Sequence, residues 1–282
     1  MVTFRSHFTL SGFGDEIDAD FETQLEVMSD LGLSAIDLRG ADDTNVLDFS
    51  ESQVEGVHDL LAEYGFDVAC IGSPIGKVGI GDDFDEHLDR FETALDTAEE
   101  FDTEYIRLFS YYIPEEDEPE DYREEVMDRM AAKAERAEER GITLLHENEK
   151  DIYGDTPARC RDMIETVGSP SLRAIFDPAN FLEIGVQPYP DALLQLVEHV
   201  EYLHIKDAQF GERGEIEPAG EGDGNIPEVL DALQQRGFSG YAALEPHLAH
   251  AGRAGGYSGP EAFEVAADAL KDCLDSVDAS YS

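Results

Sequence analysis

Four residues able to bind a divalent metal occupy equivalent positions in four successive apolar runs of the chain. They are Glu147, Asp177, His204 and Glu245. The runs that end at or beside them are Ile142–His146, Leu172–Phe176, Tyr202–Ile205 and Tyr241–Leu244. Three carboxylates and one imidazole suit Mn²⁺, Mg²⁺, Co²⁺ or Zn²⁺. None of the four candidate ligands is a cysteine, which argues against a structural zinc site. We therefore predict one divalent metal ion at these side chains, with Mn²⁺ as the first choice.

The elements that would position these ligands alternate between strand and helix along the chain. Predicted strands are the four runs above together with Phe8–Ser11, Ala35–Leu38, Phe66–Ile71 and Tyr105–Phe109. Helical spacing is found in Phe21–Leu31, Glu51–Tyr64, Phe84–Phe101, Tyr122–Arg140, Pro157–Val167, Asp191–Val200, Pro227–Gln235 and Pro260–Ser276. Eight repeats predict an α/β fold, a single (β/α)8 TIM barrel over residues 1–282. Its eight parallel strands would place the active site at their C-terminal mouth.

The charge balance limits the partners that the protein can have. There are 65 acidic residues against 19 basic ones, of which five are lysines, and the acids are spread over the whole chain. We predict the acidic surface of a halophilic protein, which would repel nucleic acid. No apolar run approaches the roughly 20 residues that span a bilayer, and neither a signal peptide nor a disulfide framework is evident. We therefore expect a cytoplasmic protein with no nucleic-acid or membrane partner.

Motifs around the candidate ligands carry a resemblance to a known family. They read HENEKDIYGDTP at 146–157, FDPANF at 176–181, LHIKDA at 203–208, PAGEGDG at 218–224 and LEPH at 244–247. The chain resembles the sugar phosphate isomerase/epimerase family of the xylose isomerase-like TIM barrel superfamily. The resemblance implies a divalent cation held by the four residues named above. It also implies that Glu147 and Glu245 flank a small carbohydrate substrate and transfer its proton.

Isomerising or epimerising a ketose requires removal of a proton from the carbon beside its carbonyl. A metal on the carbonyl and the neighbouring hydroxyl would stabilise the enediolate, while one carboxylate removes the proton and another returns it. We accordingly expect a metal-dependent isomerase or epimerase of ketoses, sugar phosphates or related polyols. The sequence leaves a homo-oligomer open.

Four further polar side chains are expected to contact the substrate: Lys206, Asn180, Arg107 and His247. Strand alternation places Lys206 on the same face as His204, where it would either hold a substrate oxygen or pair with a carboxylate. Arg107 would point inward on its strand, with the same two alternatives. Many relatives carry histidine where this chain has Asn180 and Glu149, so the family does not determine which sugar is bound.

Two neighbouring features are open to other interpretations. His146 precedes Glu147, so alternation points it to the opposite face of the strand, and we interpret it as structural. The GEGDG segment at 220–224 would either close over the site or form only a turn.

Other functions remain to be distinguished from isomerisation. An inosose-type dehydratase or lyase would use the same metal and the same proton abstraction. An abasic-site endonuclease shares the fold but needs additional histidine ligands, and most of the other histidines fall on predicted helices. A non-catalytic barrel that senses a sugar would have no need of two proton-transferring glutamates.

The acidic composition predicts that salt stabilises the fold. Raising KCl from 0.1 M to 2 M should raise the unfolding temperature, because the screening length falls from about 10 Å at 0.1 M to about 3 Å near 1 M. Thermal melts followed by circular dichroism measure this directly. An unfolding temperature that does not change with KCl would contradict the halophilic interpretation.

Overall fold

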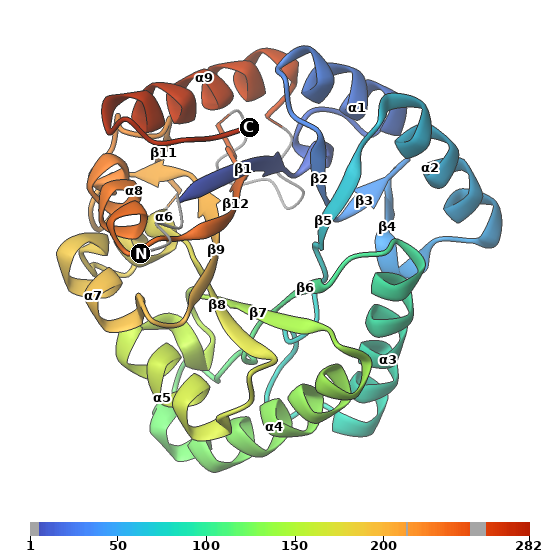
Figure 1. Cartoon of the computed structure of the whole chain (residues 1–282). Coiled ribbons are helices and arrows are strands. Elements are labelled where there is room, and N and C mark those ends of the chain that lie inside the picture. The colour runs from blue at the N-terminus through green and yellow to red at the C-terminus, as the bar shows by residue number, and fades with distance from the viewer. Residues whose placement is uncertain (1–5, 213, 249–257) are drawn as a thin grey trace, which may run out of the picture.

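The computed structural model describes residues 6–212, 214–248 and 258–282, and eight strands in this part of the chain form one parallel sheet. These strands are β1 (His7–Gly12), β2 (Ala35–Leu38), β5 (Asp67–Ile71), β6 (Tyr105–Leu108), β7 (Thr143–Glu147), β8 (Leu172–Phe176), β9 (Val200–Ile205) and β12 (Ser239–Leu244). Their order in the sheet is β1-β12-β9-β8-β7-β6-β5-β2. Figure 1 shows them at the centre of the molecule with the helices around them.

Helices follow the strands and cover the outside of the sheet. They are α1 (Phe21–Asp30), α2 (Glu51–Tyr64), α3 (Phe84–Glu100), α4 (Arg123–Arg140), α5 (Pro157–Val167), α6 (Pro178–Glu183), α7 (Leu193–Leu196), α8 (Ile226–Gln235) and α9 (Pro260–Ser276). Local signals explain their ends: α2 starts at a capping box between Ser50 and Gln53 and stops at Gly65, which is left-handed. None of the helices within the described ranges is long and apolar enough to cross a membrane.

The barrel closes at a seam between β1 and β2, which lie next to each other at the two ends of the sheet order. Within the described residues no backbone ladder joins this pair. A side-chain bond crosses the seam instead, since Ser11 Oγ of β1 donates to Asp37 Oδ2 of β2 over 2.7 Å. Tyr202 OH, from β9, also donates to Asp37, to Oδ1 over 2.9 Å. The sheet is thus a nearly closed barrel. The fold class predicted from the sequence, a TIM barrel, is therefore confirmed.

Alternate residues of the strands face opposite sides of the barrel wall. One set packs outward against the helices. The other forms a separate buried cluster inside the barrel: Ala35, Ala69, Cys70, Leu145, Ile175, Tyr202 and Ala243. Predominantly small side chains here leave room for polar groups at the C-terminal mouth.

The prediction that residues 1–282 form one domain stays a prediction, since residues 1–5, 213 and 249–257 lie outside the described part.

One predicted helix was wrong in extent. In place of Asp191–Val200 the structure has η5 (Pro188–Ala192), the single turn α7, and a turn leading into β9. Val200 pairs with Ala174 of β8, and Ala174 N donates to His199 O over 2.9 Å. The end of the segment Asp191–Val200 therefore pairs with the sheet, although the spacing of its apolar residues is helical. The remaining short elements are η1 (Gly14–Glu16), η2 (Val46–Asp48), η3 (Pro119–Tyr122), η4 (Tyr153–Asp155), β3 (Gly40–Ala41), β4 (Thr44–Asn45), β10 (Asp207–Ala208) and β11 (Ile216–Glu217).

The loop after β5 contacts the loop after β6 at a glycine that tolerates no side chain. Gly76 has φ 90°, and a Cβ there would overlap the carbonyl of Phe109. Gly76→Ala should lower the free energy of unfolding by roughly 1–3 kcal/mol from backbone strain, with the overlap adding to this loss. The matched change Gly81→Ala meets no atom within 4 Å and should shift it by less than about 0.5 kcal/mol. Urea unfolding measures both, and equal stability of the two variants would contradict the described contact.

Candidate metal centre and active site

The four predicted ligands converge at the C-terminal end of four adjacent strands. Glu147 ends β7, Asp177 follows β8, His204 lies in β9 and Glu245 follows β12. One possible ligand atom of each lies within 4.8 Å of the others, and all four residues are buried. Because β7, β8, β9 and β12 are neighbours in the sheet, equivalent positions along them meet at one place. The group is called the four-ligand centre below.

The bonding of these atoms fits a metal ion. Asp177 caps α6 with Oδ1, which accepts from Asn180 N over 3.0 Å, while its buried Oδ2 lies 2.9 Å from Lys206 Nζ. His204 Nδ1 lies 3.1 Å from Glu147 Oε1 and 3.6 Å from Glu245 Oε2. Three carboxylates and one imidazole therefore meet in a buried space. A divalent cation would accept lone pairs from all four side chains and offset the repulsion among the carboxylates, so the centre could hold a metal.

Three basic side chains surround the carboxylates. Lys206 Nζ lies 2.7 Å from Glu245 Oε2 and 2.9 Å from Asp177 Oδ2. Arg107 Nη1 lies between Glu147 Oε2, at 3.3 Å, and Glu245 Oε1, at 3.4 Å. Arg39 Nη1 reaches Glu245 Oε1 at 3.2 Å. Each carboxylate of the centre therefore has a cationic neighbour.

This arrangement sets the protonation of the carboxyl groups. Burial would raise the pKa of Glu147, but the positive charge of His204 and that of Arg107 outweigh it and lower the pKa to about 2. Burial is likewise overcome at Glu245, chiefly by Lys206, and its pKa falls well below the usual range. At Asp177, burial prevails and raises the pKa. Both glutamates are thus ionised at neutral pH.

An aromatic side chain that sequence reasoning missed supports the centre. Phe13 follows β1, and its ring lies 4.7 Å from Cζ of Arg39 and 4.8 Å from Cζ of Arg107. The His204 ring meets the same phenyl ring edge-on, with centroids 5.2 Å apart. Phe13 thereby fixes two of the cations and one ligand at once.

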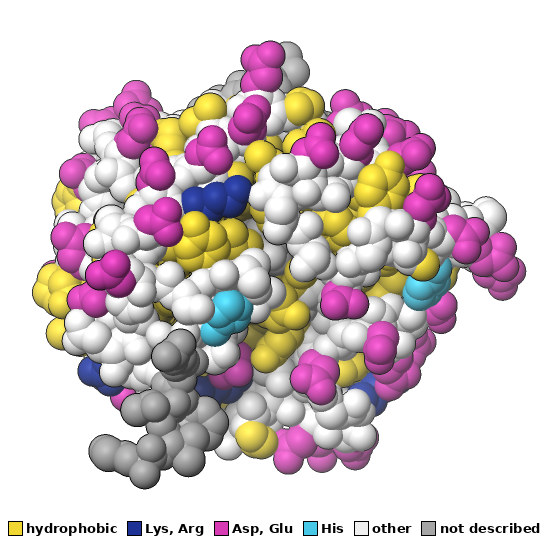
Figure 2. All heavy atoms as spheres, turned by 45° about the horizontal axis from the view of Figure 1, so that its top comes forward, with side chains coloured by type: hydrophobic (Ala, Val, Ile, Leu, Met, Phe, Trp, Pro, Cys, Tyr) yellow, Lys and Arg dark blue, Asp and Glu magenta, His cyan; other side chains and the backbone are white. Residues whose placement is uncertain are grey.

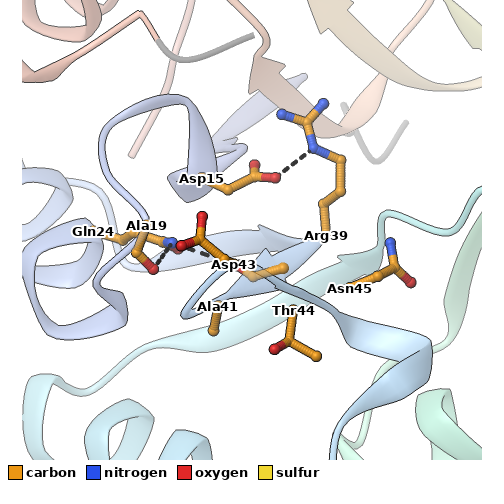
Figure 3. Close-up of a pocket in the computed structure, with 9 residues that line it drawn as sticks. Asp15, Ala19, Gln24, Arg39, Ala41, Asp43, Thr44 and Asn45 are labelled. Atoms are coloured by element: carbon orange, nitrogen blue, oxygen red, sulfur yellow. Dashed lines mark hydrogen bonds and ion pairs between the residues drawn. The ribbon is translucent and has the colours of Figure 1, made fainter. Parts of the chain in front are cut away.

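Arg39 was also missed, although its position directly after a predicted strand is the signal that identified the ligands. Its Nε donates to Asp15 over 2.7 Å and its Nη2 to Glu16 Oε1 over 2.8 Å. It also lines a cavity of about 270 Å³ with Asp15, Gln24 and Asn45. Figure 3 shows the Asp15–Arg39 contact at this cavity, which adjoins the four-ligand centre through Arg39.

The remaining predicted site residues lie close to the centre. Asn180 Nδ2 donates to Glu147 Oε1 over 3.2 Å. His247 is partly exposed, with Nδ1 3.1 Å from Glu16 Oε1 and Nε2 3.6 Å from Glu245 Oε1. All eight predicted site residues are therefore brought together, while the parts they play stay predictions.

Two side features are settled by contacts. His146 points away from the centre, as alternation predicts, with Nε2 2.9 Å from Ser110 Oγ. The segment at 220–224 is held to Asp207, whose carboxylate accepts from the N–H groups of Gly220, Gly222 and Gly224 over 2.7–3.2 Å. In this structure the segment is a tightly bound turn.

Comparison with known proteins identifies the family of the chain and supports its fold. A family model described as xylose isomerase-like TIM barrel matches residues 25–273. Over 98 residues the chain is 34% identical to 2-epi-5-epi-valiolone 7-phosphate 2-epimerase of Actinoplanes sp., which is 35% of this chain and 34% of that protein. The chain thus matches about a third of this curated relative's length.

Two solved structures share the fold over nearly the whole chain. An IOLI protein with a bound zinc atom has a TM-score of 0.78 at 15% identity, covering 96% of this chain and 99% of that one. A xylose isomerase-like TIM barrel protein from Mycobacterium smegmatis, in complex with magnesium, has a TM-score of 0.72 at 16% identity, covering 91% and 89%. At such identities these structures establish the fold alone.

The geometry predicts that metal stabilises the protein through His204. Adding Mn²⁺ at 100 times its Kd to EDTA-treated protein should increase the free energy of unfolding by about 2.7 kcal/mol.

His204→Ala should weaken Mn²⁺ binding by more than about 100-fold, since changes to residues outside the ligand set already lower metal affinity 10–100-fold. Titration calorimetry with Mn²⁺ measures this, and His199→Ala, a histidine beside Glu165 on the outside, serves as control. Equal Mn²⁺ affinity of His204→Ala and wild type would rule His204 out as a ligand.

Proposed function

The chain belongs to the xylose isomerase-like TIM barrel family, and on that premise we propose that it is a divalent-metal-dependent isomerase or epimerase of ketoses or related polyols. The observation that carries the proposal is the pair of buried glutamates, Glu147 and Glu245, within one potential ligand set. The partial match to a named epimerase supports the same class of reaction.

The two glutamates are suited to opposite sides of a bound sugar. They come from β7 and β12, the outer two of the four adjacent strands that carry the centre. One carboxylate would take the proton from the carbon beside the carbonyl and the other would return it. A return to the same carbon from the opposite side gives epimerisation, and a return to the neighbouring carbon gives isomerisation.

Cationic side chains would stabilise the negative charge that develops on the substrate oxygens. Arg107 contacts both glutamates and is held by Phe13 and Phe109, so its guanidinium is already oriented before substrate binds. Lys206 would donate hydrogen bonds to a substrate oxygen, exchanging its present contacts with Asp177 and Glu245. Asn180 would orient Glu147 through the bond to Oε1.

The residues that would hold the cation are Glu147, Asp177, His204 and Glu245. When bound, Mn²⁺ or a similar ion would supply a Lewis acid that polarises the carbonyl and the adjacent hydroxyl. Lys206 and Arg107 would remain outside the ligand set, because a protonated ammonium and a guanidinium have no lone pair to donate.

The proposal predicts that α-proton exchange depends on both glutamates. Ketoses, inososes and sugar phosphates are incubated with protein and Mn²⁺ in D₂O, and exchange is followed by NMR. Glu147→Gln and Glu245→Gln should each reduce exchange by at least about 10²–10⁴-fold, because glutamine is not basic. Glu201→Gln is the matched control, since Glu201 lies near the start of β9 beside Arg173, at the other end of the barrel.

A Glu245→Gln protein that exchanges the proton at the wild-type rate would refute the two-carboxylate mechanism. Product analysis separates the reaction classes, since a dehydrated product would identify a lyase instead.

A further inference from the structure

The polar cavity of about 270 Å³ beside the four-ligand centre lies between the loop that follows β1 and the hairpin of β3 and β4. Its wall carries carboxylates, amides, a hydroxyl and a guanidinium, and its apolar side chains are no larger than alanine. Figure 3 shows Asp15 and Arg39 on one side of the cavity and Ala41 and Thr44 on the other. No step of the reaction proposed above uses this surface.

Hydrogen bonds fix the wall of the cavity before any ligand binds. Asp42 N donates to Ala19 O over 2.7 Å, which ties the hairpin to the segment before α1. Gln53 of α2 donates from Nε2 to Thr44 Oγ1 over 3.0 Å, which ties the hairpin to a second helix. The shape of the cavity is therefore set by the fold, and a preformed site lowers the ordering cost of binding.

The wall has both an acceptor and donors to offer a ligand. Asp15 Oδ2 accepts from Arg39 Nε over 2.7 Å, while Asp15 Oδ1 is buried and has no hydrogen-bond partner among the described residues. Asn45 accepts from Leu47 N through Oδ1 over 3.1 Å, and its Nδ2 donates to no group in the described ranges. Arg39 donates three of its five N–H groups to carboxylates, so two remain in this part of the chain.

The charges around the cavity disfavour a charged ligand of either sign. A metal cation would meet the guanidinium of Arg39. An anion such as a phosphate would meet Asp15 and Asp43, and Arg39 is already bonded to three carboxylates. A hydroxyl group carries no charge and is both donor and acceptor. It can therefore donate to Asp15 Oδ1 and accept from Arg39 or Asn45.

The cavity lies within reach of a substrate bound at the four-ligand centre. A single guanidinium joins the two places, since Arg39 donates from Nε to Asp15 Oδ2 over 2.7 Å and from Nη1 to Glu245 Oε1 over 3.2 Å. This guanidinium is held over the ring of Phe13, 4.7 Å from its centroid. A sugar with its carbonyl beside Glu245 can therefore extend its far end along the guanidinium to Asp15.

We propose that the cavity binds hydroxyl groups at the end of the substrate remote from the carbonyl, with Asp15 and Asn45 as specificity-determining residues. The inference rests on the isomerase or epimerase function proposed above and names its substrate class, an uncharged ketose or cyclic polyol. Ligand hydroxyls reproduce the hydrogen bonds of the water they displace, so affinity is kept. A phosphate at that end, with about 1.5–2 negative charges at pH 7, would place unprotonated oxygens against Asp15 Oδ1.

Kinetics of α-proton exchange in D₂O with Mn²⁺ test the substrate class. Each ketose is compared with its ester phosphorylated at the remote carbon, beginning with D-fructose and D-fructose 6-phosphate. Wild type should have a kcat/KM at least about tenfold higher for the free ketose, since the ester loses one hydrogen bond to a charged group. Equal values, or a preference for the phosphate ester, would overturn the proposal.

Two variants separate the cavity from the reacting centre. Asp15→Asn replaces the unpartnered acceptor and should raise KM for the ketose about tenfold. Asn45→Asp keeps the acceptor for Leu47 N, removes the donor, and should raise KM at least about threefold. In both variants kcat should stay within about twofold of wild type, because a remote contact is made equally in the ground and transition states.

Asn225→Asp makes the same charge change at the start of α8, outside the cavity, and should leave KM unchanged. An unchanged KM in Asp15→Asn and Asn45→Asp would overturn the proposal. So would a fall in kcat alone in Asp15→Asn, because Asp15 would then act only by holding Arg39.

Crystals soaked with D-fructose decide on the cavity independently of turnover. A sugar hydroxyl oxygen should lie about 2.5–2.8 Å from Asp15 Oδ1, with or without Mn²⁺ in the crystal. A cavity without sugar, or a sugar whose hydroxyl groups all point away from Asp15, would overturn the proposal. Wild type that exchanges no ketose would refute the function proposed above, and the soak would still show whether the cavity binds hydroxyl groups.

Discussion

Repulsion among three buried carboxylates is the constraint on which the rest of the structure depends. The ligand atoms of Glu147, Asp177 and Glu245 lie within 4.8 Å of one another. At an effective dielectric constant of about 20, each pair of charges at such a distance costs roughly 3–4 kcal/mol. Because burial raises the pKa of Asp177, the full cost falls on the pair of glutamates, and this cost alone is a large fraction of the stability of a typical domain, about 5–15 kcal/mol. The fold therefore has to bring cations to this point, with or without a metal ion.

The N-terminal half of the barrel meets this requirement although it supplies none of the four ligands. Arg39 follows β2 and Arg107 lies in β6, and both reach Glu245 across the mouth. Phe13, after β1, packs against both guanidinium groups and against His204. Strand pairing brings Phe13 and Arg107 to the ligand-bearing half, since β1 pairs with β12 and β6 pairs with β7, while closure at the β1–β2 seam brings Arg39 there. The arrangement of the strands in the barrel therefore also determines which cations neutralise the carboxylates.

Acidic and basic side chains are also distributed differently between the surface and the interior of the molecule. Figure 2 shows acidic side chains scattered over the visible face with few basic ones among them. Basic side chains nevertheless lie inside the protein, where Arg107, Lys206, Lys133 and Arg129 are buried. Arg107 and Lys206 contact the carboxylates of the four-ligand centre, and Lys133 and Arg129 lie over the ring of Tyr111. A surface that depends on screening and an interior that depends on local pairing would respond differently to salt.

Sequence alone determined what is local or repeated. Apolar runs of four to six residues and segments with helical spacing predicted the eight strands and nearly all the helices, and the ligands followed because equivalent strand ends must meet in a parallel barrel. Tertiary structure decided what depends on contacts between distant residues. Arg39 and Glu245, 206 positions apart, meet only after closure. The helix expected up to Val200 gave way to sheet pairing, and the position of Lys133 over the Tyr111 ring is visible only once its neighbours are packed. Side-chain direction and burial set these outcomes, and neither is encoded in local spacing.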